Sequence, residues 1–276
     1  MLNLPIEFII IVLVFLVLAI LEIYKPWYQA EKIKKVRWLS YIGLYFFNML
    51  ILRIILPITV VACAIYIEKQ QYGLLNIIEA SSYIEIIIGI ILLDFMSYVS
   101  HRLMHIFSPL WRLHRVHHAD TDYDVATHFC HHPLEFFIGT SFIFLVIGIF
   151  GIPVVAVLIF TLMSELTGLF THSNIFIPKK IDQYLRLIMI TPAMHRTHHS
   201  DDLGDSNSNF GTNFPWWDYV LNTYRAHPIA GYEGMKLGVK GFKESKWQLL
   251  PWILVQPFYK GNQDLEILEK DKSFPS

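Results

Sequence analysis

Charge and cysteine are both scarce in this sequence. Charged residues make up 16% of its 276 residues, whereas average soluble domains carry roughly 25%, and the mean hydropathy is +0.43. This composition indicates a membrane protein. The two cysteines, Cys63 and Cys130, provide neither a disulfide framework nor a CxxC zinc site. The net charge of -1 gives no overall basic field, so we expect no nucleic-acid partner.

Long apolar runs are abundant, by contrast. A helix of about 20 apolar residues crosses the hydrocarbon layer of a bilayer. Four regions reach this length, and the last is long enough for two helices joined by a hairpin at "GIP". They are Phe8–Tyr24, Trp38–Ile67 (with tilt or a kink at Pro57), Tyr83–Ser100 and Phe136–Phe170. We also expect an interfacial helix in "KKIDQYLRLIMI" and a loosely ordered tail from Asn262.

The distribution of lysine and arginine predicts the orientation. The loop after the first run carries five basic residues, which are Lys25, Lys32, Lys34, Lys35 and Arg37, whereas the connector from Glu68 to Ala80 carries one lysine. The positive-inside rule then places the first loop in the cytoplasm. Counting spans from that loop brings twelve of the thirteen histidines to the same cytoplasmic face. The sequence therefore predicts one shared histidine site there.

The motif "HRLMH" places His101 and His105 one helical turn apart on the same face. Asp94 and Tyr98 extend this stripe upstream. A carboxylate within a span usually has a partner, and Asp94 could accept the free N–H of a metal-bound imidazole. The alternative is a pair of interfacial histidines beside an aspartate that faces a polar cavity.

The triplet "HRVHH" (His114, His117, His118) recurs as "HRTHH" (His195, His198, His199). Spacing of i, i+3 and i+4 on a helix aims three imidazoles at one point, which suits a metal ion. Together with the HxxxH pair, these triplets provide eight ligands, which suit two metal ions better than one. Neither HExxH nor GxSxG occurs. Imidazole binds zinc, copper, iron and nickel alike, and a structural zinc would need only four ligands.

Between Asp94 and Tyr224 the chain resembles the fatty acid hydroxylase / sterol desaturase superfamily of integral-membrane, non-haem di-iron oxygenases. The motifs are "DFMSYVSHRLMH", "LWRLHRVHHADTDYDVATHFCHHPLE", "THSN", "TPAMHRTHHS" and "SNFGTNFPWWDYVLNTY". The resemblance implies three segments: N-terminal transmembrane helices (1–93), a catalytic domain (94–224) and an amphipathic, polar tail (225–276). The expected fold is an all-α integral membrane protein of about four to five transmembrane helices, with a cytoplasmic helical cap that carries the dimetal site.

The resemblance also assigns roles to individual residues. It implies metal ligands at His101, His105, His114, His117, His118, His172, His195, His198 and His199, and includes His132 as a tenth ligand or an outer partner. Outer partners are expected at Asp94, Tyr98, Glu135 (to orient His132), Asn174 and Asn209. His128 and His131 match no motif position. Asp218 matches a family position whose role does not follow from the sequence. The family's usual Phe-Gly-Thr reads "LNT" here, with Asn222 in place of glycine.

The activity implied is hydroxylation or desaturation of a lipid C–H bond with O₂ at two iron ions, which zinc could replace in a purified preparation. No flavin, haem or iron–sulfur motif occurs, so a separate electron donor is implied, either a cytochrome or ferredoxin type or a pterin. Phe136, Phe137, Phe142 and Phe170 could line a lipid tunnel, although an ordinary core or lipid-facing role is favoured for each of them. One alternative is pterin-dependent cleavage of ether lipids, as in alkylglycerol monooxygenases. The other is a membrane metal-binding or transport protein.

Overall fold

A computed structural model describes residues 6–29, 34–56, 58–78 and 81–261, and the tail expected to be loosely ordered lies outside this part. Within it, the regular elements are helices, apart from two isolated β-bridges. The α-helices are α1 (Ile6–Tyr24), α2 (Lys34–Ile55), α3 (Val60–Lys69), α4 (Ser82–Ile106), α5 (Ser108–His118), α6 (Pro133–Phe150), α7 (Val154–His172), α8 (Lys179–Leu185), α9 (Pro192–His198), α10 (Leu203–Ser206), α11 (Trp216–Val220), α12 (Gly231–Gly234) and α13 (Leu250–Val255). Four short 3₁₀ helices are η1 (Leu74–Asn76), η2 (Val125–Phe129), η3 (Ser245–Gln248) and η4 (Gln256–Phe258).

Within the described residues, five helical segments are long and apolar enough to cross a membrane, which confirms the prediction of an all-helical membrane protein. Four of them are α1, α4, α6 and α7, and the fifth runs from α2 to η1. Their outer faces carry exposed apolar side chains such as Leu13 and Leu145, as lipid contact requires. The run predicted as Trp38–Ile67 forms two helices, α2 and α3. The kink expected at Pro57 lies outside the described residues.

Two connectors meet at the end of the bundle remote from the histidines. Gly151 ends α6 in the left-handed conformation, with φ of +68°, which glycine adopts without steric cost. Gly73 packs so closely against this turn that a Cβ on it would lie 2.1 Å from the Gly151 nitrogen. The α6–α7 turn and the connector before α4 therefore lie side by side.

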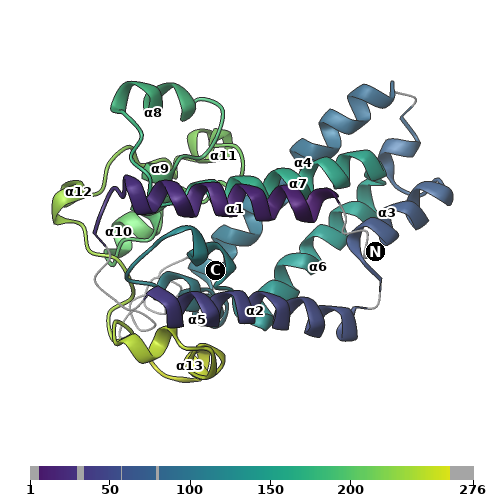
Figure 1. Cartoon of the computed structure of the whole chain (residues 1–276). Helices are drawn as coiled ribbons and strands as arrows, with labels where there is room; N and C mark the ends of the chain where they lie inside the picture. The colour runs from purple at the N-terminus through teal and green to yellow at the C-terminus, as the bar shows by residue number, and fades with distance from the viewer. Residues whose placement is uncertain (1–5, 30–33, 57, 79–80, 262–276) are drawn as a thin grey trace, which may run out of the picture.

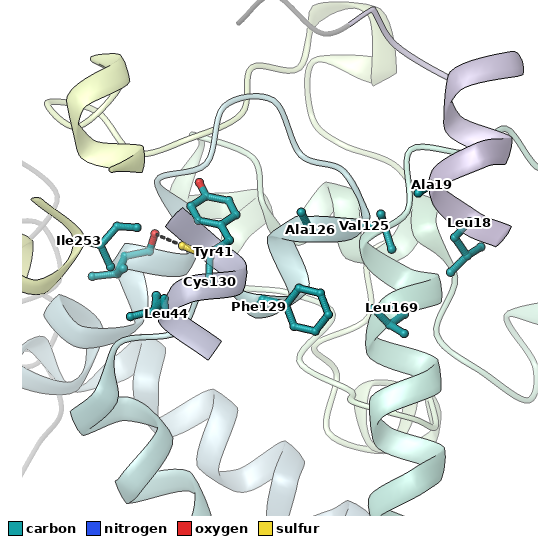
Figure 2. Close-up of a cluster of buried hydrophobic side chains, with 11 residues drawn as sticks. Leu18, Ala19, Tyr41, Leu44, Val125, Ala126, Phe129, Cys130, Leu169 and Ile253 are labelled. Carbon is teal, nitrogen blue, oxygen red and sulfur yellow. Dashed lines mark hydrogen bonds between the residues drawn. The ribbon is translucent and has the colours of Figure 1, made fainter. Parts of the chain in front are cut away.

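The short helices form a cap at the opposite end of the bundle, on the left of Figure 1. Its loop between α5 and α6 packs into a cluster that includes Leu18, Leu44 and Leu169 from three long helices. Phe129 and Cys130 fill the centre of this cluster (Figure 2), and the Cys130 thiol lies 3.8 Å from the carbonyl oxygen of Val116. The apolar packing fixes the loop that directly follows the second histidine triplet.

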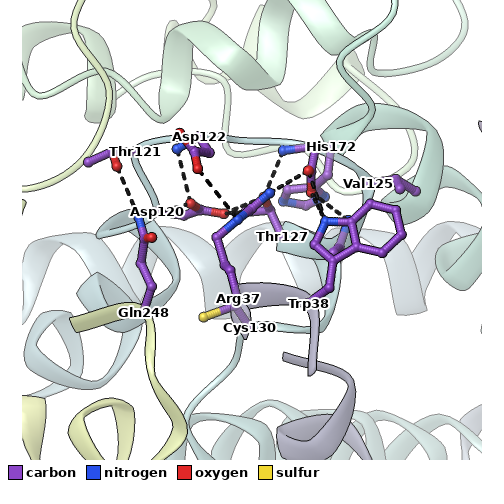
Figure 3. Close-up of polar contacts among 12 residues, drawn as sticks. Arg37, Trp38, Asp120, Thr121, Asp122, Val125, Thr127, Cys130, His172 and Gln248 are labelled. Atoms are coloured by element: carbon purple, nitrogen blue, oxygen red, sulfur yellow. Dashed lines mark hydrogen bonds and ion pairs between the residues drawn. The ribbon is translucent and has the colours of Figure 1, made fainter. Parts of the chain in front are cut away.

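A buried ion-pair cluster holds the N-terminal part of α2 to the same loop (Figure 3). Arg37 donates to Asp120 at 2.5 Å and also to Asp124, and its Nε lies 3.8 Å from a carboxylate oxygen of Asp122. Thr127 donates to Asp120 at 2.6 Å. Arg37, which we counted among the cytoplasmic charges, is therefore neutralised inside the protein.

The predicted interfacial helix is α8, and its side chains Ile181 and Tyr184 are exposed. Exposed apolar side chains beside Lys179 and Lys180 are typical of a helix that lies on a membrane surface. The cap therefore has an apolar edge of its own.

Candidate metal centre

Four helices converge to bring nine histidines together where the bundle meets the cap. His101 and His105 come from α4, the first triplet from α5, His172 from the last residue of α7, and the second triplet from α9 and the residue after it. Proline in the first turn helps to start both α5 and α9, and Thr191 caps α9 by accepting from the backbone N–H of Met194. Two short helices with well-defined N-termini thus position the two histidine triplets.

The nine histidines divide into two groups. Within each group, one nitrogen of every ring lies within 4.8 Å of the others. The first group is His101, His105, His114, His118 and His198, and the second is His117, His172, His195 and His199. The triplets are shared between the groups, because α5 and α9 each contribute histidines to both. The eight motif histidines predict two metal ions, but the spacing directs each triplet at one point, whereas the structure divides each triplet between two adjacent groups. The reason is that α5 and α9 lie where both groups meet.

The first group has nitrogen lone pairs that face one another. His101 Nδ1 lies 2.9 Å from the carbonyl oxygen of Phe210, and His114 Nδ1 lies 2.7 Å from a carboxylate oxygen of Glu135. Because these oxygens only accept, both Nδ1 atoms must donate, and in a neutral ring Nε2 is then a bare acceptor. These two Nε2 atoms are nevertheless 3.1 Å apart. Two facing acceptors repel each other unless a cation lies between them.

The second group repeats this arrangement. His172 Nδ1 donates to Gly168 O at 2.7 Å, and His117 Nδ1 donates to Cys130 O at 3.2 Å. Their Nε2 atoms face each other at 3.0 Å. Nitrogens bound to one metal ion at about 2.0–2.1 Å would lie roughly 3 Å apart. The spacing of the nitrogens therefore fits a bound ion.

Several other buried ring nitrogens in these groups have no hydrogen-bond partner within the described part of the chain. They are His105 Nε2, His195 Nδ1, His198 Nε2 and both nitrogens of His199. An unsatisfied buried polar atom is costly. His198 Nδ1 donates to Ser208 O at 2.7 Å, which leaves its Nε2 as a lone pair directed into the first group. The donor set is suited to metal ions.

Burial keeps five histidines of the two groups neutral, namely His117, His118, His195, His198 and His199. Burial lowers the pKa of His117 well below its usual value, and nearby histidines, His131 first among them, lower it further. The pKa values of His118 and His199 fall in the same way, first through burial and then through neighbouring imidazoles, as do those of His195 and His198. A neutral imidazole is the form that binds a metal, so these rings are ready for ligation at neutral pH.

Glu135 supports His114 rather than His132 through its side-chain oxygen. Its Oε1 accepts from His114 Nδ1 and, at 2.8 Å, from His131 Nδ1. His132 contacts the Glu135 carboxylate through its backbone N–H, at 3.3 Å, and not through its ring. The expectation that Glu135 orients the His132 ring therefore needs correction. The reason is that the α6 N-terminus packs beside α5, a contact between segments that local spacing does not reveal.

His132 lies outside both histidine groups. Its Nδ1 accepts from the backbone N–H of Leu134 and so caps α6, and its Nε2 lies 3.3 Å from Leu254 O. His131 stacks on His117 with ring centroids 4.2 Å apart. Burial opposes a charge on His131, but the Glu135 carboxylate raises its pKa above the usual value. Of these neighbours, it is His131 that approaches the site.

Asp94 is buried, but its partners are not histidines. It accepts from the backbone and side-chain N–H groups of Asn213, at 3.1 and 3.0 Å, and from Trp217 at 2.8 Å. This differs from the predicted bond to an imidazole. The hydroxyl of Tyr98 likewise lies 3.0 Å from the Thr223 hydroxyl. Asp94 thus fastens α4 to α11 and the loop before it, and Tyr98 fastens α4 to the loop after α11, so both act on the site through the backbone.

The loop held by α4 is also fixed from within by Asn209 and Asp218. Asn209 has φ of +55° and bonds to the backbones of Met194 and Arg225. Asp218 accepts from the N–H groups of Phe210 and Gly211, both at 2.8 Å. These bonds aim the carbonyls of residues 208 and 210 at His198 and His101. Asp218, whose role the sequence left open, thus positions a carbonyl that orients a ring.

Asn174 supports the turn after His172. Its side chain bonds to the backbone of Tyr28 at both N–H and carbonyl, and its backbone N–H donates to Glu22 at 2.6 Å. The turn is thereby tied to the end of α1. Asn174 acts on His172 through the chain rather than by touching the ring.

A cavity of about 340 Å³ adjoins the histidines between α2, α4, α6 and α7. Five histidines of the two groups lie on its wall, namely His101, His114, His117, His172 and His195. Of the aromatics expected in a tunnel, Phe136 and Phe142 line it, whereas Phe137 and Phe170 do not. A second cavity of about 390 Å³ shares the lining residues Phe136, Thr140, Ile143 and Phe160. An apolar space thus leads from the membrane helices to the histidines.

Comparison with known proteins identifies relatives. A model described as fatty acid hydroxylase matches residues 86–223, which is half of the chain. The ornithine lipid hydroxylase OlsE of Rhizobium tropici is 31% identical over 186 residues, covering 66% of this chain and 53% of that protein.

Two alkylglycerol monooxygenases also match. That of Caenorhabditis elegans is 30% identical over 48% of this chain and 25% of its own length. The human protein is 27% identical over 52% and 34% respectively. The chain thus spans about half or less of the length of these relatives. No solved structure gives a significant match.

Proposed function

Because the chain belongs to the fatty acid hydroxylase family, we propose that it hydroxylates a lipid with O₂ at two iron ions held by the two histidine groups. The facing pairs of bare Nε2 atoms, at 3.1 Å in one group and 3.0 Å in the other, carry this proposal. The first ion would be held by His101, His105, His114, His118 and His198, and the second by His117, His172, His195 and His199. Catalytic residues beyond these ligands are not assigned.

The reaction has a simple balance. A lipid C–H bond, O₂, two electrons and two protons give a C–OH group and one water. The iron pair would supply the activation of O₂, which protein side chains do not provide. The chain binds the lipid in the apolar cavity and excludes bulk water. Glu135 holds the N–H of His114 and so fixes which nitrogen faces the metal.

The electrons come from a separate donor under this proposal, since the sequence carries no flavin, haem or iron–sulfur motif. A cytochrome or ferredoxin type, or a pterin, would serve. The matched residues 86–223 nearly coincide with the proposed catalytic segment 94–224. Lys25 and Lys35 support a cytoplasmic position of the histidine end, although Arg37 is paired internally.

The names of the relatives suggest two candidate substrates for this proposal. The ornithine lipid hydroxylase covers the largest share of this chain among the relatives described above, so we propose an ornithine-type lipid as the first candidate. The alkylglycerol monooxygenase matches make an alkylglycerol the second. The two adjoining cavities provide room for hydrocarbon in either case.

The test uses the full chain, purified in detergent and loaded with Fe²⁺. Ornithine lipid and alkylglycerol are supplied separately with ¹⁸O₂, and with either reduced ferredoxin or tetrahydropterin. We expect about two irons per chain and a lipid product that is heavier by one ¹⁸O atom. Oxidation of alkylglycerol with the pterin alone would transfer the assignment to the ether-lipid reaction. Iron flux into vesicles without O₂ consumption would instead establish a transporter and refute the oxygenase.

A further inference from the structure

Three hydroxyl groups on the wall of the 340 Å³ cavity are satisfied by their own helices. Ser97 donates to Leu93 O at 3.0 Å, Thr140 to Phe136 O at 2.8 Å and Thr171 to Gly168 O at 3.2 Å. Such groups present little unsatisfied polarity to a ligand. They are compatible with a hydrocarbon chain.

Glu165 and His128 form an ionisable pair on the same wall. The carboxylate oxygen Oε2 of Glu165 lies 3.1 Å from His128 Nε2. The Glu165 side chain is 29% exposed and that of His128 15%, although both belong to the cavity lining. The other oxygen of Glu165, Oε1, has no hydrogen-bond partner among the residues that the structure describes. An acceptor at membrane depth that faces a cavity calls for a donor from the occupant.

The pair is built into the fold at Gly168. A Cβ at this position would lie 2.3 Å from His128 Cε1 and 2.5 Å from its Nδ1. Only glycine lets the imidazole lie against α7 and reach Glu165 one turn away. Glu165, Gly168 and His172 follow one another at i, i+3 and i+7, so they share a face of α7. One face of α7 therefore carries Glu165, which pairs with His128, then Gly168, which leaves room for the His128 ring, and then His172, the proposed iron ligand.

We propose that Glu165, held by His128, is a substrate-binding residue that accepts a hydrogen bond from an ammonium or hydroxyl group of the lipid. The cavity would then receive a polar part of the substrate, and not an alkyl tail alone. This inference rests on the proposed lipid hydroxylation and narrows its substrate class to lipids with an N–H or O–H donor.

The position of Glu165 sets the distance between donor and reaction site. Seven residues of helix separate it from His172, which is about 10 Å along the axis of α7. A donor held at Glu165 would thus place carbons about 10 Å further along the lipid beside the histidines. The charge of the cavity lining also suits a donor group on the lipid. Glu135 and Glu165 line the cavity, whereas no lysine or arginine occurs among the described residues that line it.

The experiment compares E165Q with the iron-loaded wild type. The control is E68Q, because Glu68 also contacts α7, where it accepts from the N–H of Val154 at 3.3 Å, but it lies outside the cavity lining. Binding of ornithine lipid, of its N-acetylated form and of alkylglycerol is measured by native mass spectrometry, and oxidation of each by product analysis. Iron content and the thermal midpoint are recorded for every variant.

We expect E165Q to retain iron and to bind the donor-bearing substrate at least tenfold more weakly, with KM rising more than kcat falls. E68Q should match the wild type. A preference for ornithine lipid over its N-acetylated form that E165Q abolishes identifies ammonium as the donor, whereas the same loss with alkylglycerol identifies hydroxyl. Equal binding of all lipids by E165Q and wild type would overturn the inference. If lipids bind selectively but none is oxidised, the proposed function fails while the binding residue stands.

Discussion

Two buried polar clusters occupy the same end of the molecule, and they are satisfied in opposite ways. The acidic cluster around Arg37 joins one guanidinium to three aspartates, Asp120, Asp122 and Asp124 (Figure 3). The histidine groups consist of neutral rings whose lone pairs face one another at 3.0–3.1 Å. Asp120 follows His118 by two residues, so one loop connects the clusters. The first cluster contains its own counter-charge, and the second requires a cation from outside.

This difference separates a structural role from a metal-binding one. Both clusters would be expensive to bury unpaired. Arg37 supplies opposite charge to the carboxylates, so that cluster can form as soon as α2 packs on the loop. The histidines turn only acceptor nitrogens toward one another, so each group is complete when metal is bound. Changes in the two clusters should accordingly alter different measured quantities.

The largest effect is expected from H117A and H198A, which each remove a ring from one group. Loss of an outer partner of a metal ligand already costs about 10–100-fold in affinity or activity, so loss of a ligand should exceed that. We expect both variants to lose iron loading and lipid oxidation together. Iron per chain by mass spectrometry and product formation are the two measurements.

H227A is the matched control, because His227 is exposed and outside both groups. It should bind iron and oxidise lipid as the wild type does. Normal oxidation by H117A and H198A would contradict the assignment of these histidines as ligands.

Breaking the acidic cluster should reduce stability before it reduces metal binding. R37M leaves three buried carboxylates without their guanidinium, and removal of one partner from a buried ion pair costs about 3–5 kcal/mol. We expect a markedly lower thermal midpoint in detergent, with iron bound by the fraction that stays folded. K35M, at an exposed position in the same helix, should be unchanged. A stable R37M without iron would mean that Arg37 serves the metal site directly.

Much of the fold could be predicted from the sequence, because hydrophobic length is a local property. The runs that became α1, α4, α6 and α7 were recognisable from composition alone. The separation of α2 from α3 was not, since a long apolar run does not show where its helix stops. The face of each histidine triplet was predictable for the same local reason, namely helical periodicity.

The partners of the buried acids could not be predicted, because they depend on contacts between distant segments. Asp94 pairs with Asn213, 119 residues away, although we expected it to accept from a metal-bound imidazole. Glu135 pairs with His114 across 21 residues, although His132 is its neighbour in sequence. His128 pairs with Glu165 across 37 residues, and Gly168, which makes room for the ring, carries no motif. Periodicity fixes the direction of a side chain but not the group it meets.

Glu135 offers a finer test of how the histidine groups are supported. E135Q keeps an oxygen that can accept from His114 but loses the negative charge. We expect a loss of about tenfold in iron affinity or activity, at the lower end of the range for outer partners, with little change in the thermal midpoint. Competition with a chelator of known affinity measures the iron affinity. E244Q, at an exposed site, is the control, and an E135Q protein that matches it would show that the carboxylate charge does not tune His114.

The smallest effect is expected at His132, where the family resemblance and the geometry differ. The ring caps α6 through Nδ1 and lies outside both groups, and asparagine is a good helix cap as well. H132N should therefore keep both irons and full oxidation, whereas H132A should lose about 1 kcal/mol of stability with the cap and still bind iron. Iron per chain decides between the two roles, because a ligand would be lost equally in both variants. If H132N and H132A both fall to the iron content of H117A, His132 joins the metal site, and the division between histidines that bind metal and residues that hold the helices has to be redrawn at α6.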